Sequence, residues 1–211
     1  MWKKIMSGLL MAVALVTLTA CGSTGSTASQ PASDGAKAAA SQGKVLVVYF
    51  SATGNTKRVA ETIANHENAT IFEIKPTEPY SDSDLNYRDD NSRVVREHAQ
   101  PQLRPTYEGD VADWDSYDTV YIGYPLWWQQ APHVVYTFVE GHNFSGKKVI
   151  PFCTSAASSL GDSGQNLAKA AGTGDWQTGV RFNGGASDND VLNWLQQQEG
   201  NSYRKKRCVV T

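Results

Sequence analysis

Runs of apolar residues recur along the middle of the chain and are separated by more polar stretches. Residues 45–50, 120–123 and 149–152 are continuous runs rich in β-branched or aromatic side chains, and shorter runs occupy residues 70–74 and 180–182. An apolar run without polar alternation predicts a strand that is buried on both faces, as in a parallel sheet. The pattern therefore predicts five parallel strands.

The stretches between these runs carry apolar residues at helical spacing. After the first run, Val59 and Ile63 fall on one face of a segment from 56 to 64. Strands that alternate with helices predict an α/β fold, here a three-layer α/β/α sandwich. Further helices are predicted at residues 133–141, 160–171 and 187–197, the last with Ser187 or Asp188 as its cap.

The N-terminal segment has the pattern of an export signal. Lys3 and Lys4 precede an apolar stretch from Ile5 to Ala20, which is shorter than the ~20 apolar residues of a spanning helix and ends in small residues. This predicts a signal peptide over residues 1–20. Leu18 to Cys21 resembles the lipobox of bacterial lipoproteins, which implies a lipid on the Cys21 sulfur; a plain secretory signal is the alternative.

Composition divides the rest of the chain. Residues 22–43 are dominated by Gly, Ser, Thr and Ala, which cannot bury enough surface to fold, so residues 21–43 are predicted to be a flexible, lipid-anchored linker. The folded domain is predicted over residues 44–200 and a basic tail over 201–211. The expected location is outside the cytoplasm, at the membrane of a bacterial cell.

Charge and cysteine content exclude several classes of function. The net charge is −2, but six of the positive charges lie at the two ends, so the body of the chain is acidic. An acidic body argues against nucleic acid as a partner, because phosphates require a basic surface. Cys153 ends an apolar run and is predicted to be buried in a strand; a pairing with Cys208 stays open. The spacing of the four histidines indicates no metal site.

The segment from Phe50 to Thr56 combines hydroxyls, an amide and one glycine at a predicted strand-to-helix turn. Gly54 allows a tight turn in which backbone N–H groups converge, and the unpaired N–H groups of the next helix face the same point. Ser51, Thr53 and Thr56 can add O–H donors. The loop lacks the spacing of the other common phosphate motifs. It is therefore predicted to hold a bound monophosphate.

Residues 45–60, VLVVYFSATGNTKRVA, resemble the opening of flavodoxins, in which S/T-x-T-G-x-T wraps the phosphate of flavin mononucleotide (FMN). The resemblance extends over residues 44 to about 195. It implies a five-stranded parallel sheet of order 2-1-3-4-5, with the flavin where the strand order reverses. In this loop it assigns cofactor contacts to Ser51, Ala52, Thr53, Gly54, Asn55 and Thr56.

Two later loops match the same resemblance. Adjacent tryptophans in a loop are costly to expose unless they cover something flat, and the loop after the third strand resembles the Y-P-I-W-W loop of short flavodoxin-like proteins. The loop after the fourth strand carries small residues that let backbone approach a ring. The expected flavin contacts are Tyr124, Pro125, Leu126, Trp127 and Trp128 in the first of these loops, and Thr154, Ser155, Ala156, Ala157, Ser158 and Gly161 in the second.

The chain also departs from the family pattern. Gln129 stands where relatives often have glycine, and we expect it to resist a positive φ. Ala156, Ala157 and Ser159 occupy a loop that is commonly glycine-rich. Asp110, Asp113, Asp115 and Asp118 precede the third strand, where they are expected to lower the flavin potential or to steer a basic redox partner.

Residues 78–113 interrupt the alternation of strands and helices. The segment is polar and long, and we expect a partly helical excursion in place of a crossover helix. Four short segments resemble an insert of some small flavodoxin-like proteins: Pro79-Tyr80, Asp84-Leu85-Asn86-Tyr87, Asn91-Ser92-Arg93 and Arg104-Pro105. This predicts a position beside the flavin, as a lid; a solvated charged loop is the alternative.

Three functions fit these features. The first is a membrane-anchored FMN protein that carries electrons to an unidentified partner protein or small acceptor, rather than a turnover enzyme. The second is an NAD(P)H-dependent reductase of FMN, quinones or other small acceptors. The third is a surface binding module that has lost the flavin, for which the glycine losses in the third loop are the only support.

Overall fold

The computed structural model describes the backbone of residues 43–208 and the side chains up to residue 200. The predicted signal peptide, Cys21 and the linker up to residue 42 lie outside these residues, as do the side chains of the basic tail. The division of the chain ahead of the folded domain therefore stays a prediction from the sequence. Within residues 43–208, no helix is both long and apolar enough to span a membrane.

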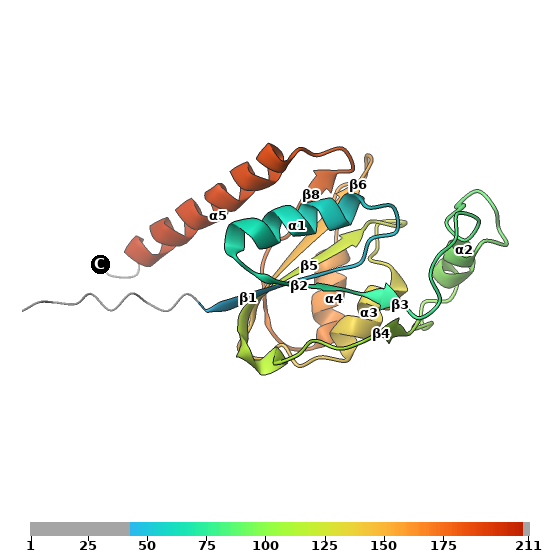
Figure 1. The fold of residues 1–211 in the computed structure, drawn as a ribbon, viewed down its shortest axis with the longest axis horizontal. Coiled ribbons are helices and arrows are strands. Elements are labelled where there is room, and N and C mark those ends of the chain that lie inside the picture. Colours follow the sequence, from blue (N-terminus) through green and yellow to red (C-terminus); the bar gives the residue numbers. More distant parts are fainter. Residues whose placement is uncertain (1–42, 209–211) are drawn as a thin grey trace, which may run out of the picture. The chain divides into compact units, whose positions relative to one another are not determined.

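A parallel sheet forms the centre of the domain (Figure 1). β2 and β5 flank β1, β6 follows β5, and two short strands pair with the outer edge of β6; every pair is parallel. When the two short strands are counted as one divided edge strand, the order is 2-1-3-4-5, which confirms the prediction. The strands are β1 (Lys44–Tyr49), β2 (Thr70–Glu73), β5 (Tyr117–Pro125), β6 (Lys148–Ser155), β7 (Asp175–Trp176) and β8 (Val180–Asn183).

The break between β7 and β8 lies opposite Pro151 of β6. The neighbouring carbonyl of Val149 accepts from the Gln177 N–H at 2.8 Å, but Pro151 has no N–H to donate to the edge strand. Gly179 passes close to this point, where a Cβ atom would lie 2.4 Å from the Pro151 carbonyl oxygen. The proline thus interrupts the ladder, and the glycine lets the edge strand pass it.

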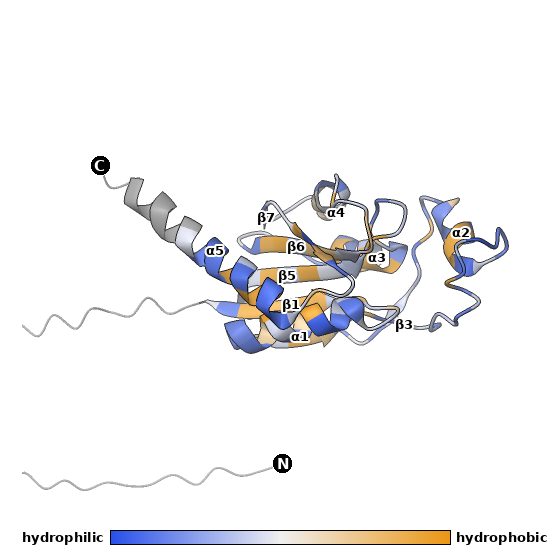
Figure 2. Ribbon diagram, turned by 90° about the horizontal axis from the view of Figure 1, so that it is seen from above, coloured by the Kyte–Doolittle hydropathy of each residue, from blue (hydrophilic) through white to orange (hydrophobic). Residues whose placement is uncertain are grey.

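Helices cover both faces of the sheet. β1 alternates between them: Leu46 and Val48 pack in the same cluster as α3 (His133–Glu140) and α4 (Ser163–Ala171), while Val47 and Tyr49 pack with α1 (Asn55–Glu67) and α5 (Asp188–Cys208). Figure 1 shows the two pairs of helices on opposite sides of the sheet, and Figure 2 shows the hydrophobic strands between them. The three-layer sandwich is therefore as predicted, and both faces of a central strand are buried.

Three helices differ from their predicted bounds by three residues or more. α1 ends at Glu67, past the predicted end at residue 64. α4 begins at Ser163 rather than at residue 160, because the Ser163 side chain and N–H bond back to the Leu160 carbonyl oxygen and close a turn ahead of the helix. α5 continues to Cys208, past the predicted end at residue 197. Its start is capped by Ser187: the Asp190 carboxylate accepts from the Ser187 N–H at 2.8 Å, and Ser187 Oγ accepts from the Asp190 N–H at 3.3 Å.

A long segment leaves the sheet between β2 and β5. β3 (Lys75–Pro76) and β4 (Tyr107–Glu108) pair antiparallel at its base, and residues 77–106 between them are called the insert below. The insert holds one short helix, α2 (Arg93–His98), capped by Ser92, whose Oγ accepts from the Val95 N–H at 3.4 Å. The prediction of a partly helical excursion is confirmed. A single 3₁₀ turn (Trp114–Ser116) then leads into β5.

Candidate functional site

The loop between β1 and α1 turns on Gly54. Its φ is +87°, and a Cβ atom added there would meet nothing within 4 Å. The glycine is therefore required by the backbone conformation rather than by space, because a positive φ is unfavourable for residues with a side chain. The Gly54 N–H donates to Ser51 Oγ at 3.1 Å, which holds the turn closed.

The N-terminus of α1 is arranged to receive an anion. No side chain caps it, and its first turn contains no acidic residue. Thr53, Gly54 and Asn55 are exposed at this point. The first N–H groups of a helix lack intrahelical partners and carry the positive end of the helix dipole. Uncapped and exposed, they suit a phosphate at the carboxyl end of β1.

Two buried hydroxyls join this loop to the loop after β6. Thr56 Oγ1 and Thr154 Oγ1 lie 2.8 Å apart, and their residues are 1% and 5% exposed. One hydroxyl donates to the other, so one proton remains for another acceptor. Both threonines lie below the surface, where they hold two of the predicted flavin loops at a fixed separation.

The loop after β5 closes in a two-residue turn. Trp127 and Gln130 exchange backbone hydrogen bonds of 3.0 and 2.8 Å, and the residues between them, Trp128 and Gln129, have φ of +46° and +61°. The expectation that Gln129 resists a positive φ is therefore wrong. A tight turn with positive φ at both central positions is the type I′ kind, and its paired hydrogen bonds offset the backbone strain.

The two tryptophans have different surroundings. The Trp127 ring meets Phe50 at 5.7 Å and Tyr80 at 5.5 Å, both nearly edge-on, and is partly buried. Trp128 is 41% exposed, and one face of its indole is stacked on His98 of the insert, with ring centroids 4.6 Å apart and planes 10° apart. In this conformation only the opposite face of Trp128 is open for a ring to stack on.

Tyr124 does not contribute its side chain to this surface. It is fully buried, and its hydroxyl lies 3.0 Å from Ser163 Oγ at the start of α4. The ring does not line the surface, because a residue inside β5 on the α3 and α4 face points into the core, and a flavin contact through the Tyr124 backbone stays a prediction. Pro125 and Leu126 follow at the strand end, and the Leu126 N–H donates to the Thr154 carbonyl oxygen at 2.9 Å.

The loop after β6 is held by Arg181 of β8. Its Nη2 donates to the carbonyl oxygens of Ser155 and Ala156, both at 2.8 Å. Ser155 Oγ also donates to the Ser158 carbonyl oxygen at 2.8 Å, and residues 156–159 are exposed. The loop is therefore ordered with its tip available to a ligand.

The missing glycines do not distort this loop. Ala156, Ala157 and Ser159 all lie outside the positive-φ region, and only Gly161 enters it, at +53°. A Cβ atom on Gly161 would lie 3.9 Å from Gln129 Oε1, so the loop approaches the tryptophan turn. The three predicted flavin loops thus converge at the carboxyl ends of β1, β5 and β6.

The acidic residues ahead of β5 are at the opposite edge of the sheet. Asp113 and Asp115 belong to the 3₁₀ turn, and Asp118 is the second residue of β5, whereas the tryptophan turn follows its last residue, Pro125. The strand between Asp118 and Pro125 covers roughly 23 Å, which exceeds the Debye length of about 8 Å at physiological salt. The expectation that these charges tune the flavin site is therefore wrong.

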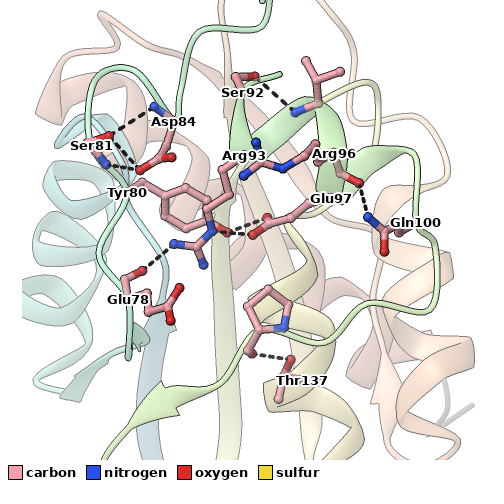
Figure 3. Close-up of polar contacts among 12 residues, drawn as sticks. Glu78, Tyr80, Ser81, Asp84, Ser92, Arg93, Arg96, Glu97, Gln100 and Thr137 are labelled. Atoms are coloured by element: carbon pink, nitrogen blue, oxygen red, sulfur yellow. Dashed lines mark hydrogen bonds and ion pairs between the residues drawn. The ribbon is translucent and has the colours of Figure 1, made fainter. Parts of the chain in front are cut away.

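The insert is joined to the site by a buried network (Figure 3). The Tyr80 O–H donates to Glu97 Oε2 at 2.7 Å, and Arg93 Nε lies 2.6 Å from Glu97 Oε1. The Arg93 guanidinium also covers the Tyr80 ring at 4.0 Å. Burial and the Glu97 carboxylate raise the pKa of the Tyr80 hydroxyl well above its usual range, so it stays a donor. Because Tyr80 also contacts Phe50, the insert is packed onto the first loop.

Comparison with known proteins places this geometry in a family. The family model described as flavodoxin matches residues 44–198. The chain belongs to the flavodoxin family. Two solved proteins named as flavoproteins are similar to this flavodoxin: one of Bacteroides uniformis ATCC 8492 (40% identity, 73% of this chain and 98% of that chain, TM-score 0.69) and one of Bacteroides eggerthii DSM 20697 (38%, 72% and 96%, 0.67). No curated protein matches the chain.

A flavoprotein of Lactobacillus acidophilus NCFM, solved in complex with FMN, shares the flavodoxin fold. It is 23% identical, with 72% of this chain and 99% of that chain covered and a TM-score of 0.55. In this flavodoxin, the residues present fit the same group. The uncapped start of α1 suits a phosphate dianion, and the exposed Trp128 beside the tip of the third loop suits a flat ring.

Three residues of the site were not predicted from the sequence. Arg181 orders the third loop, and His98 stacks on Trp128. Gly184 lies in the loop before α5 and close to Asn55: a Cβ atom built on Gly184 would be 3.3 Å from Asn55 Nδ2. Only Arg181 carries a sequence signal, since a charged residue inside an apolar strand requires a partner. The other two depend on how distant segments pack.

One group of metal-ligating side chains forms within residues 43–200. Side-chain atoms of His66, Glu67 and Glu199 all lie within 4.8 Å of one another at the C-terminal end of α1. Spacing did not predict it, because Glu199 comes from α5. The group is at the end of α1 away from the flavin loops, and exposed acidic groups of this kind assign no metal by themselves.

Proposed function

We propose that this flavodoxin binds FMN and passes electrons between proteins or small molecules at a bacterial membrane. The observation that carries the proposal is the start of α1, directly after Gly54. It has no capping side chain and no acidic residue in its first turn, and it lies at the same edge of the sheet as the tryptophan turn. The FMN complex of the Lactobacillus protein supports it, because that protein has the same fold.

Each part of the site has a task in this proposal. The loop around Gly54 holds the phosphate through N–H and O–H donors, and Arg181 keeps the third loop in the shape that borders the ring. Trp127 and Trp128 exclude water from one side of the ring. When bound, FMN supplies the chemistry by accepting and releasing electrons.

The phosphate contact is tested by comparing FMN with riboflavin, which lacks the phosphate. We expect the full-length protein to bind FMN at least about 100-fold more tightly, since several charge-assisted hydrogen bonds are involved. Thr53→Val removes an exposed hydroxyl of the loop and should weaken FMN about tenfold, which corresponds to ~1.4 kcal/mol, without changing riboflavin affinity. Titration with quenching of flavin fluorescence measures both constants.

Thr70→Val is the matched control, since Thr70 is exposed at the amino end of β2, away from the loops. It should leave both affinities unchanged. Equal affinity for FMN and riboflavin in the wild-type protein contradicts the phosphate contact. A protein that binds neither ligand supports the alternative of a module that has lost the flavin.

Electron transfer is tested by anaerobic reduction followed by absorbance. Dithionite should bleach the flavin of the FMN-loaded protein, and NADPH alone should not, because a carrier depends on a separate reductase. Rapid bleaching by NADPH alone contradicts the carrier and supports a reductase.

We also propose that the protein is anchored through a lipid on Cys21. The support is the Leu18 to Cys21 motif behind an apolar stretch with a basic start. Two acyl chains bury enough CH₂ groups, at about 0.8 kcal/mol each, for stable anchoring. Full-length protein should partition into the detergent phase of Triton X-114, and Cys21→Ser should shift it to the aqueous phase. Cys208→Ser is the control and should stay in the detergent phase. If Cys21→Ser stays there as well, Cys21 carries no anchor.

A further inference from the structure

A cavity separate from the three predicted flavin loops adjoins the tryptophan turn, on the side of the insert. It has a volume of about 370 Å³ and is called the insert pocket below. This size suits one small aromatic molecule. None of its residues belongs to the three predicted flavin loops as assigned from the sequence. Its lining is His98, Pro101, Arg104, Gln130, His133 and Tyr136.

The walls of the insert pocket are fixed to each other. Arg104 of the insert makes two hydrogen bonds to the Glu140 carboxylate of α3, both 2.8 Å. Thr137 of α3 donates to the Pro105 carbonyl oxygen at 2.8 Å, a contact visible in Figure 3. The insert is therefore held against α3 on one side of the cavity, while His98 is stacked on Trp128 at the other.

The insert pocket offers little net charge to a ligand. The Arg104 guanidinium is neutralised by Glu140, and its Nη1 donates to the carbonyl oxygens of Pro101 and Leu103 at 2.8 and 3.0 Å. Burial lowers the pKa of His133; the Glu97 carboxylate opposes this, and the charges of Arg104 and His98 lower it further, so this imidazole is neutral at pH 7. An anionic ligand would find no unpaired guanidinium here.

A free donor in the insert pocket comes from Gln130. Its Oε1 accepts from the Tyr136 O–H at 3.1 Å and from Asn166 Nδ2 at 3.0 Å. These two donors fix the orientation of the amide, which leaves its Nε2 with two N–H groups. Within residues 43–200 no protein acceptor receives them, and Nε2 is not among the buried unpaired atoms, so it faces the open space. An unpaired amide donor at the edge of a cavity is the kind of group that orients a ligand.

The other side chains of the lining are mostly rings, those of His98, His133 and Tyr136. The Nδ1 atom of His133 is buried and does not face the cavity, so this imidazole supplies a flat wall rather than a polar contact through that atom.

We propose that the insert pocket binds an uncharged planar molecule whose ring carries carbonyl oxygens, as oxidised quinones do, with Gln130 Nε2 donating to one of those oxygens. The ring lies against Tyr136 and the imidazoles, and the compensated charge of Arg104 disfavours carboxylates. This goes beyond the proposed function, because the pocket is assigned without reference to flavin.

The test uses duroquinone, a quinone whose ring is fully substituted and therefore does not add to cysteine thiols. Isothermal titration calorimetry is run on full-length protein from which flavin has been removed. We expect 1:1 binding, weakened at least tenfold by Gln130→Glu, which keeps the two acceptor contacts of Oε1 but replaces the donating Nε2 by an oxygen. Far-UV circular dichroism checks that each variant is folded.

Gln129→Glu is the matched control, since it makes the same change one residue away at a side chain that does not line the cavity. It should change duroquinone affinity less than twofold. Wild-type protein that does not bind duroquinone, or a Gln130→Glu variant that binds it as tightly, overturns the proposal. So does 1-naphthoate binding more tightly than duroquinone, which would assign the pocket to anions.

Competition with FMN separates this inference from the proposed function. Saturation with FMN should leave duroquinone binding in place. If the apparent Kd for duroquinone rises in proportion to the FMN concentration without levelling off, the quinone occupies the flavin site, and the insert pocket is rejected while FMN binding stands. If FMN does not bind at all but duroquinone does, with the Gln130 dependence, the insert pocket stands and the proposed function falls.

Discussion

Replacing Gly54 by alanine isolates the conformation on which phosphate binding depends. The φ of +87° is unfavourable for alanine, while a Cβ atom would meet nothing within 4 Å, so the cost is backbone strain without a clash. Left-handed backbone costs about 1–2 kcal/mol for a residue with a side chain, and the stiffer unfolded chain returns about 0.4–1 kcal/mol. Gly54→Ala should therefore lower the free energy of unfolding by roughly 1 kcal/mol in flavin-free protein.

Gly146→Ala serves as the matched control. Gly146 also has a positive φ, +77°, with nothing within 4 Å of an added Cβ atom. It precedes β6 at the amino edge of the sheet, about 25 Å of strand from the loops. Urea unfolding followed by circular dichroism should give similar losses for the two variants.

Flavin affinity should distinguish the two variants. An alanine at position 54 favours a negative φ, which turns the Gly54 N–H away from Ser51 and disperses the donors at the start of α1. We expect FMN affinity to fall at least about tenfold in Gly54→Ala and to stay unchanged in Gly146→Ala. If the two variants lose stability equally and bind FMN equally well, the turn around Gly54 does not hold the phosphate.

Three further outcomes follow from buried groups. Tyr80→Phe removes the hydrogen bond to Glu97 and should cost about 1.5 kcal/mol, which is roughly 3–6 °C in thermal unfolding; an unchanged midpoint would contradict the network. Burial raises the pKa of Cys153 to about 12, so iodoacetamide at pH 8 should leave it unlabelled in native protein and label it in urea, as read by mass spectrometry. Because the pKa of His133 is lowered in the folded state, the unfolded chain binds its proton first as the pH falls below about 6.5. Wild-type stability should then fall more steeply than that of His133→Gln between pH 7 and 5; parallel curves would refute the assignment.

The sheet could be predicted because its determinants are local. An unbroken apolar run such as residues 45–50 must be buried on both faces, and only a parallel sheet with helices on both sides does this. The divided edge could not be predicted in the same way. Pro151 is visible in the sequence, but its effect falls on the strand that pairs with it, and pairing is known only once the fold is formed.

The candidate site was predicted unevenly for a similar reason. The loop around Gly54 depends on its own residues, and its positive φ follows from the glycine. The turn at Trp128 and Gln129 depends on hydrogen bonds between its ends, which override the backbone preferences of the residues in the middle. The effect expected of the acidic residues before β5 was wrong for a simpler reason: residues that precede a parallel strand lie at its amino end, whereas the flavin loops follow the carboxyl ends.

The tryptophan turn is the point where the two proposed sites meet. Trp127 packs against Phe50 at the end of β1 and Tyr80 of the insert, and the last residue of the turn, Gln130, lines the insert pocket. Because its hydrogen bonds define a single tight geometry, a ligand that shifts Trp128 must also move Gln130 or break the turn. Occupancy of one site is thereby linked to the shape of the other through four residues of backbone. By thermodynamic reciprocity, any effect of FMN on quinone affinity must equal the effect of the quinone on FMN affinity.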